Sequence, residues 1–249
     1  MNITGNTVFI PGATSGIGLA LALALRDRGN TVIVGGRRKQ LLDQIAAEHP
    51  GIGTVYIDTA DPQSVVTAAQ QVINAYPEVN VLVTMAGSMR AEDWTASTLL
   101  ADAEALVTTN LLGPIRLIAA FVEHLQTRPH ATIMTVSSGL AFAPLAMTPT
   151  YNATKAGIHL LSESIRMQLA GTSVEVLELV PPGVQTELMP GNSHNPLAQP
   201  LEEFIAEVMS LIEAQPDATE ILVERAKFLR YGEARGDYAQ VVAALNSTD

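Results

Sequence analysis

Two side chains that could together move a proton lie four residues apart in the second half of the chain. Tyr151 and Lys155 would project from one face of a helix, because residues at this spacing are neighbours on a helix surface. An ammonium beside a phenol favours the phenolate and lowers its pKa from about 10, so the phenol becomes a general acid or base near neutral pH. An ordinary helix pair, with the lysine amine reaching solvent, has the same spacing and remains the alternative.

A glycine-rich turn near the start of the chain could bind phosphate. Gly12, Gly16 and Gly18 are spaced GxxxGxG between an apolar run and an Ala/Leu-rich segment. Small residues let a backbone approach a pyrophosphate, and a helix that begins there offers free N–H groups and partial positive charge. The spacing is neither GxGxxG nor a Walker loop, so a tight turn without a ligand is the alternative. The cofactor contacts expected in this turn are Gly12, Thr14, Ser15, Gly16, Ile17 and Gly18.

The end of the second apolar run indicates which dinucleotide would bind. Folds that bind NAD carry an acidic residue here for the ribose 2′-hydroxyl, whereas an arginine accommodates the 2′-phosphate of NADP. The segment between Gly29 and Gln40 has no Asp or Glu, and it contains Arg37 and Arg38. Two solvated arginines at a helix start are the alternative, although a cation is mildly unfavourable at that end of the helix dipole. We therefore expect NADP(H) to be preferred over NAD(H).

Short β-branched runs alternate with longer helical patterns along the chain. This alternation predicts βαβ units with right-handed crossovers, and continuous apolar runs suit strands buried on both faces of a parallel sheet. We expect one α/β domain over residues 1–249, a doubly wound, Rossmann-type parallel sheet, with a substrate lid or loop region at about 183–214. The expected strands are 7–10, 31–34, 54–57, 81–84, 132–136, 174–180 and 221–223, and the expected helices are 19–28, 39–48, 62–76, 101–125, 150–169, 201–214 and 238–245.

The composition excludes several classes of function. The 249 residues contain no Cys, which rules out disulfides, thiolate metal sites and cysteine nucleophiles, and the five His lack metal-ligand spacing, so we expect no metal. The net charge of −11 argues against a nucleic-acid partner. The first residues do not resemble a secretion signal, and the longest charge-free stretch, 131–154, is too rich in Ser, Thr and Pro to span a membrane. We expect a cytoplasmic protein with no membrane partner.

Three further segments give the Tyr151–Lys155 pair a specific context. Ser138 lies thirteen residues before Tyr151 at the end of an expected strand, and Asn110 lies within the long expected helix. Together with the glycine turn and the segment Pro181-Pro182-Gly183-Val184-Gln185-Thr186, these positions resemble the short-chain dehydrogenase/reductases of the short single-domain branch, over nearly the whole chain. The resemblance implies an oxidoreductase that transfers a hydride between a nicotinamide cofactor and a small carbonyl or alcohol substrate.

The resemblance also implies a role for each catalytic position. Tyr151 would donate a proton to the carbonyl oxygen as the hydride arrives, or remove it during oxidation. Lys155 would lower the Tyr151 pKa and hold the nicotinamide ribose. Ser138 would hydrogen-bond the substrate oxygen, and Asn110 would hold a water that connects Lys155 to solvent. Further cofactor contacts that the resemblance implies are Arg37, Arg38, Asp58, Thr59, Ala86, Gly87, Asn110, Tyr151, Lys155, Pro181, Gly183 and Thr186.

The chain departs from the family pattern in two places. Pro11 stands before Gly12 where the family has Thr, which removes a backbone donor. Thr84 and Met85 replace two Asn, which alters a local sheet hydrogen bond and one cofactor contact, so we expect changed affinity rather than lost binding. The C-terminal part, 201–246, looks most like a bacterial branch named for D-alanine esterification of teichoic acid.

Apolar residues dominate the expected substrate region, which predicts a neutral, fairly hydrophobic ketone or secondary alcohol. The expected substrate contacts are Ser138, Leu140, Phe142, Leu145, Tyr151, Leu188 and Met189. In the family the long helix and the Tyr151 helix form a subunit interface, so we expect a homodimer or homotetramer. The alternative function is a dinucleotide-binding regulatory or scaffold protein with little turnover, which only the altered Thr84-Met85 pair supports.

Overall fold

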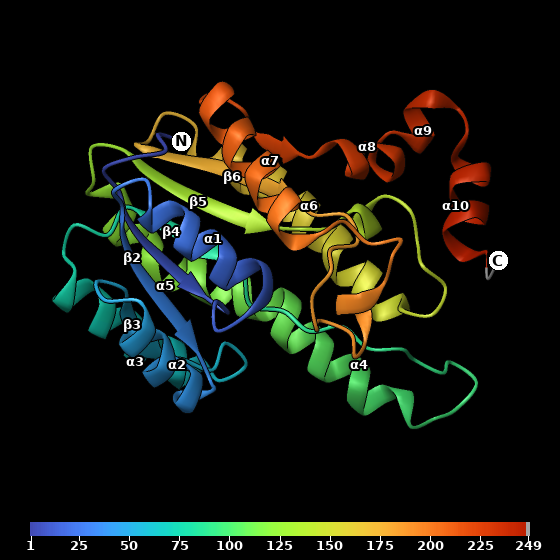
Figure 1. The fold of residues 1–249 in the computed structure, drawn as a ribbon, viewed down its shortest axis with the longest axis horizontal. Coiled ribbons are helices and arrows are strands. Elements are labelled where there is room, and N and C mark those ends of the chain that lie inside the picture. Colours follow the sequence, from blue (N-terminus) through green and yellow to red (C-terminus); the bar gives the residue numbers. More distant parts are fainter. Residues whose placement is uncertain (248–249) are drawn as a thin grey trace.

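The computed structural model describes residues 1–247. Seven parallel strands form one sheet in the order β3-β2-β1-β4-β5-β6-β7 (Figure 1). This is the doubly wound order of dinucleotide-binding folds, with β7 added at one edge, so the expected single Rossmann-type domain is confirmed. The strands are β1 Thr7–Pro11, β2 Thr31–Gly36, β3 Gly53–Tyr56, β4 Val81–Thr84, β5 Ala131–Val136, β6 Val174–Val180 and β7 Glu220–Leu222.

Helices cover both faces of the sheet. One layer contains α1 (Gly16–Arg26), α2 (Lys39–Glu48) and α7 (Leu201–Ala214), and the other contains α3 (Pro62–Ala75), α5 (Gly113–Gln126) and α6 (Pro149–Leu169). Strand β1 shows how the sequence builds two cores, because alternate side chains of a strand point to opposite faces. Val8 and Ile10 pack with the α1 layer, whereas Phe9 packs on Phe121 of α5 with ring centroids 5.4 Å apart.

The long helix expected over 101–125 is not a single α-helix. It consists of α4 (Leu99–Val107), a π-helical turn over Thr108–Leu112, and α5. A π turn inserts an extra residue into the helical ladder and is frequent at functional sites. Asn110 lies in this turn and is fully buried. Sequence periodicity did not predict the break, because the apolar pattern runs through it.

The stretch Leu99–Gln126 is long and apolar enough to cross a membrane by length and composition alone, with a mean hydropathy of 1.6. Its α5 half packs on the sheet, where Leu117, Phe121 and Leu125 are fully buried. Other apolar side chains of this stretch, including Leu112 and Ile115, are exposed. The helix therefore has one face in the core and a second apolar face at the surface.

The range 183–214, expected as a lid or loop region, divides into two parts. Residues 183–200 form a loop with one 3₁₀ turn, Asn192–His194, and a bridge between Val184 and Gln199. The second part is α7, which buries five side chains in the core and contacts α1. The loop part contributes less to the core cluster, of which Val184 is its buried member.

Three short helices follow β7, of which the sequence predicted only the last. They are α8 (Glu224–Arg230), α9 (Gly232–Arg235) and α10 (Tyr238–Asn246), and they extend beyond the carboxyl ends of the strands (Figure 1). Asn246 fastens α10 to the loop after β5, because its amide donates to the Pro144 carbonyl at 3.0 Å and accepts from the Ala146 N–H at 2.6 Å.

The closest backbone approach in the glycine turn gives a stability prediction. A Cβ on Gly12 would lie 2.5 Å from the Ala86 backbone, and Gly12 has φ of +91°. Gly51 has nearly the same φ, +94°, but nothing within 4 Å of such a Cβ, so it is a matched control. We expect Gly51→Ala to cost about 1 kcal/mol of unfolding free energy and Gly12→Ala about 3 kcal/mol or more, as measured by chemical denaturation. Equal losses would show that Ala86 does not enforce glycine at position 12.

Candidate active site

The predicted site residues gather at the carboxyl ends of the central strands. The glycine turn follows β1, Ala86 and Gly87 follow β4, and Ser138 follows β5. Successive strands are added on one side of β1 up to β3 and on its other side from β4, and ligands of open α/β sheets bind outside the carboxyl ends of the strands at such a switch point.

The backbone of the glycine turn passes so close to neighbouring atoms that side chains at its glycines would contact them. A Cβ on Gly18 would lie 2.7 Å from the Gly12 carbonyl oxygen, and one on Gly16 would lie 3.5 Å from the Thr186 side chain. Thr186 therefore lies over the turn, which joins the Pro181–Thr186 segment to the same site. Among residues 1–247, no side chain caps the start of α1, where Ser15 is the N-cap. The first N–H groups of α1 thus remain available to an anion.

Arg38 rather than Arg37 contacts the glycine turn. The Arg38 guanidinium donates through Nε to Thr14 Oγ1 at 3.0 Å and through Nη2 to Ser15 Oγ at 2.7 Å. Arg37 is largely exposed and approaches the Asp58 carboxylate at 4.0 Å. Arg38 thus lies against the turn that begins α1, and Arg37 lies near Asp58 on the loop after β3. An uncapped helix start, a glycine cradle and two arginines fit the phosphates of a dinucleotide.

Loops at neighbouring strand ends are held close to this cradle. Arg116 of α5 donates to the Ala60 carbonyl at 2.8 Å, and a Cβ on Gly113 would lie 3.2 Å from Thr59, so α5 supports the loop after β3. The Gly139 N–H donates to the Pro181 carbonyl at 2.8 Å, which ties the end of β6 to the Ser138 loop. Gly183 accepts from the Gln199 N–H at 2.8 Å.

Ser138, Tyr151 and Lys155 come together between β5 and the start of α6. All three are buried, and the Ser138 side chain lies close enough to the Tyr151 phenol to oppose the rise in its pKa. Ser138 Oγ also accepts from the Leu140 N–H at 3.1 Å, which caps a 3₁₀ turn over Gly139–Ala141. Lys155 Nζ donates to the Val136 carbonyl at 2.8 Å and lies 5.6 Å from the Tyr151 ring centroid.

Burial dominates the protonation of both ionisable groups. It raises the pKa of Tyr151 to about 12, against the opposing effect of the Ser138 hydrogen bond. It lowers the pKa of Lys155 to about 8, and the nearby charge of Glu178 opposes this change. The expected lowering of the Tyr151 pKa by Lys155 is thus not seen, because desolvation of the phenolate outweighs the opposing effect of Ser138. Near neutral pH the phenol holds its proton and can act as a donor.

Asn110 reaches the site through the π turn between α4 and α5. Its amide accepts from the Ser88 N–H and donates to the Ser88 carbonyl, both at 2.8 Å. A Cβ on Gly87 would lie 3.4 Å from Asn110 Oδ1 and 3.9 Å from Lys155 Nζ, so Gly87 separates the two groups. The structure therefore brings together Gly87, Asn110 and Lys155 from β4, the π turn and α6.

Several residues that sequence reasoning missed fix the first turn of α6. Glu92 Oε2 accepts from the Thr150 N–H at 2.7 Å, and Asn152 bonds both the Thr148 hydroxyl and the Leu145 carbonyl. These contacts hold the helix start that carries Tyr151. Glu92 offered no sequence signal, because it is far from Tyr151 along the chain.

The expected substrate contacts differ in their surroundings. Leu140 and Leu145 are half-buried in the loop after β5, whereas Leu188 is exposed and Met189 half-buried in the loop after β6. The Phe142 ring packs edge-on against His159 at 4.6 Å, and the Arg230 guanidinium lies over it at 4.3 Å. Phe142 is thus fixed by two contacts within the chain, and its contact with a substrate stays a prediction.

Comparisons with known proteins agree with this arrangement. A family model described as short chain dehydrogenase matches residues 6–196. An uncharacterized oxidoreductase of Bacillus subtilis, DltE, is 36% identical over the full length of both chains, and sulfoacetaldehyde reductase 2 of Chromohalobacter salexigens is 30% identical over 72% of this chain and 73% of its own. A short chain dehydrogenase of Burkholderia cenocepacia, solved in complex with NADP, superposes with a TM-score of 0.84 at 25% identity, covering 99% of this chain and 100% of its own.

The match to DltE extends through the C-terminal part, as the sequence resemblance predicted, whereas the family model ends at residue 196. The NADP-bound neighbour supports a nicotinamide dinucleotide as the cofactor type. With the doubly wound sheet, the glycine cradle and the Ser138–Tyr151–Lys155 group, these matches establish that the chain belongs to the short chain dehydrogenase family of oxidoreductases.

Proposed function

We propose that this protein is a cytoplasmic NADP(H)-dependent oxidoreductase that interconverts a neutral, fairly hydrophobic ketone and its secondary alcohol. The observation that carries the proposal is the buried group in which the Ser138 side chain and the Lys155 ammonium both lie close to the Tyr151 phenol.

The chain supplies orientation and a proton, while the nicotinamide supplies or accepts the hydride when bound. In reduction, the substrate carbonyl oxygen accepts hydrogen bonds from the Ser138 and Tyr151 hydroxyls. The Tyr151 proton passes to that oxygen as negative charge develops on it, so the carbonyl becomes an alcohol and the phenol a phenolate. The Lys155 ammonium stabilises this phenolate, and the protonated state of free Tyr151 suits the reductive direction.

Two arginines support the preference for NADP(H). Arg37 and Arg38 follow β2, where the 2′-substituent of the adenine ribose is recognised in this fold, and no carboxylate competes from the same turn. Arg38 is pre-oriented by Thr14 and Ser15, so a phosphate there would gain a fixed fork of donors. Asp58 is already neutralised in part by Arg37.

An apolar surface on α5 and α6 supports a homodimer or homotetramer. Leu112 and Ile115 of the long helix and Leu160 and Met167 of α6 are exposed, with Met167 72% accessible. Exposed apolar patches commonly mark protein interfaces. A second copy of the chain, docked through the same face, would bury them.

One observation favours a regulatory or scaffold protein with little turnover. Thr84 Oγ1 is buried and finds no hydrogen-bond partner within residues 1–247, at the strand end where the family has Asn. This departure affects β4 and leaves the Ser138–Tyr151–Lys155 geometry in place. We therefore rank this function second.

Replacing Tyr151 with Phe tests the catalytic proposal. Purified protein should oxidise NADPH in the presence of ketones from a neutral panel, and Tyr151→Phe should lower kcat/KM by about 100- to 10,000-fold because the proton donor is lost. Tyr56→Phe, at an exposed tyrosine, is the matched control and should retain wild-type rates. If wild-type protein binds NADPH but reduces no carbonyl, the regulatory function replaces the enzymatic one.

Alanine substitutions at the two arginines test the cofactor preference. Arg38→Ala and Arg37→Ala should each weaken NADPH binding by about 10-fold or more and leave NADH binding nearly unchanged, because only NADPH carries the 2′-phosphate. Binding is measured by nucleotide fluorescence. Arg26→Ala, at the far end of α1, controls for the change in net charge. Equal weakening of both nucleotides would refute the 2′-phosphate role.

A charged residue on the apolar surface tests the oligomer. Leu160→Glu should shift the protein toward monomer in size-exclusion chromatography with light scattering, because the exposed leucine would lie in the interface. Val66→Glu, at an exposed apolar residue of α3, should leave the mass unchanged. A wild-type monomer at micromolar concentration would contradict this assembly.

A further inference from the structure

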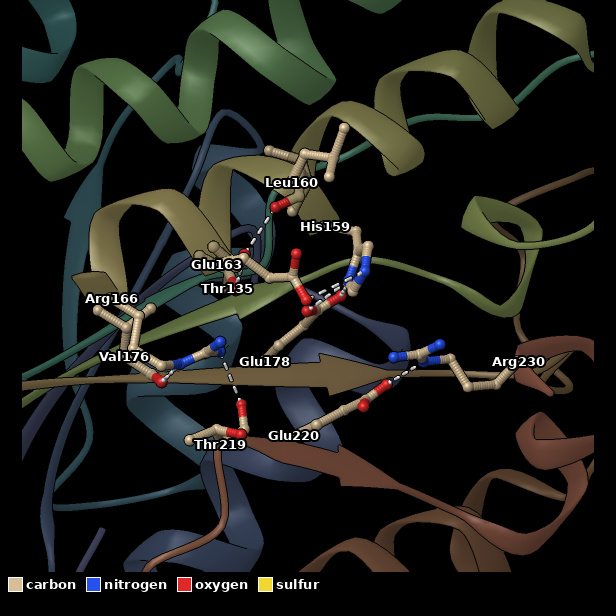
Figure 2. Close-up of polar contacts among 12 residues, drawn as sticks. Thr135, His159, Leu160, Glu163, Arg166, Val176, Glu178, Thr219, Glu220 and Arg230 are labelled. Carbon is tan, nitrogen blue, oxygen red and sulfur yellow. Dashed lines mark hydrogen bonds and ion pairs between the residues drawn. The ribbon is translucent and has the colours of Figure 1, made fainter. Parts of the chain in front are cut away.

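The row of side chains that contains Tyr151 and Lys155 continues one turn further along α6. His159 follows at the same spacing of four residues, so the three side chains lie in line on one helix face. His159 Nδ1 lies 2.9 Å from Oε2 and 3.1 Å from Oε1 of Glu178 on β6 (Figure 2). The third side chain of this row, His159, therefore bonds the carboxylate of Glu178.

Glu178 occupies a position where a β-strand normally carries an apolar residue. It is 1% exposed, and its neighbours across the sheet are Thr135 on β5 and Glu220 on β7. The Thr135 hydroxyl is hydrogen-bonded to Ser162 of α6 at 2.7 Å, so α6 covers this face of β5 and β6. Desolvating a carboxylate costs several kcal/mol, and a charge kept in such a place requires a compensating partner.

The charges that face His159 come from three elements. Glu178 lies on β6 and Glu163 on α6, 3.7 Å from Nε2, while Arg230 of α8 reaches the ring only through Phe142. Arg230 is itself paired with Glu220 of β7 at 2.8 Å (Figure 2). The hydrogen bond that His159 donates to Glu178 is the largest of several effects that raise the pKa of His159. The imidazole thus holds the carboxylate in one orientation.

Lys155 lies one helical turn from His159, which is about 5.4 Å along the axis. Its ammonium donates to Val136, whose partner in the sheet is Leu179, the residue after Glu178. Burial favours the neutral amine, and the Glu178 charge is what opposes it. The Lys155 ammonium and the Glu178 carboxylate thus both lie between α6 and the paired strands β5 and β6. The attraction between two such charges is stronger where water is excluded.

We propose that Glu178 is a positioning residue whose buried carboxylate, held by His159, keeps Lys155 in its charged form. The catalytic consequence rests on the proposed function, since a neutral Lys155 would no longer stabilise the Tyr151 phenolate. The effect on Lys155 itself is a property of the folded chain and is measurable without any substrate. Glu220 offers a matched control, because it occupies the paired position on β7 but bonds Arg230.

Lysine NMR tests the proposal directly, because the chain contains only Lys39, Lys155 and Lys227. In full-length protein with ¹³C-labelled lysine, Lys155→Met assigns the signal of the buried amine. Its midpoint in wild-type protein should lie near pH 8 and fall by about one pH unit in Glu178→Gln. Glu220→Gln should leave it unchanged. An unchanged midpoint in Glu178→Gln, or an equal fall in Glu220→Gln, overturns the proposal.

A second variant separates the charge from the packing of Glu178. Glu178→Asp retains the carboxylate and should keep most of the wild-type midpoint, whereas a fall as large as that of Glu178→Gln would show that packing is responsible and overturn the proposal. Circular dichroism verifies that each variant is folded. If Glu178→Gln does not fold, the double variant His159→Leu/Glu178→Met removes both partners of the pair, a replacement that buried ion pairs commonly tolerate. The Lys155 midpoint should fall there too, and an unchanged one overturns the proposal.

Activity supplies the separate readout of function. Where NADPH-dependent reduction is measured, kcat/KM should decline as pH rises through about 8 in wild-type protein, because Lys155 loses its proton there. In Glu178→Gln the decline in kcat/KM should move to lower pH by the same amount as the Lys155 midpoint. A decline that stays at the wild-type pH would show that the protonation of Lys155 does not control catalysis. Absence of any turnover by wild-type protein would count against the proposed function, while the lysine titration still decides the role of Glu178.

Discussion

A lysine ammonium buried beside a phenol is the constraint on which the site depends. Lys155 loses its hydration on folding and regains one hydrogen bond, to the Val136 carbonyl at the end of β5. An amine in such a place is costly unless neighbouring charges and dipoles replace the lost water. The surrounding elements serve this need, since Gly87 leaves room beside the ammonium and Glu178 supplies negative charge from β6.

The nucleotide end of the site depends on close backbone packing rather than on charge. Gly12 and Gly18 lie against the Ala86 backbone and against the turn itself, so the chain after β1 passes where side chains cannot fit. This packing leaves the uncapped N-terminus of α1 facing the carboxyl edge of the sheet. The nucleotide end of the site is thus formed by closely packed backbone near β1. The Tyr151–Lys155 end depends instead on a buried charge near β5 and β6.

Sequence patterns predicted the elements best where local periodicity and burial agree. The bounds of α2, β6 and α7 match expectation in full, because their apolar positions follow one period and Gly, Pro or polar residues flank them. The π turn at Asn110 escaped prediction, since an extra residue in a ladder leaves no compositional mark. Helices α8 and α9 escaped as well, because they are too short to show a period.

The residues of the candidate site also divide into those that local sequence spacing predicts and those that it does not. Tyr151 and Lys155 are local in sequence, and helix spacing alone places them together. Glu178 lies far from them along the chain, and only the pairing of β5 with β6 beneath α6 brings it close. His159 did carry a signal, the repeated spacing of four from Tyr151 and Lys155, yet a single histidine in an apolar helix is more often an ordinary core residue.

The C-terminal helices contact the loop that follows Ser138. The family model ends at residue 196, before α7 and the three helices that follow β7. These helices touch the loop after β5 at three points: Leu229 packs against Gly139, Arg230 covers Phe142, and Asn246 holds Pro144 and Ala146. Because that loop begins at Ser138, the C-terminal helices set its shape without altering the proton donor. The helices beyond the family model therefore support the loop that carries Leu140, Phe142 and Leu145, while Ser138, Tyr151 and Lys155 lie within the matched segment.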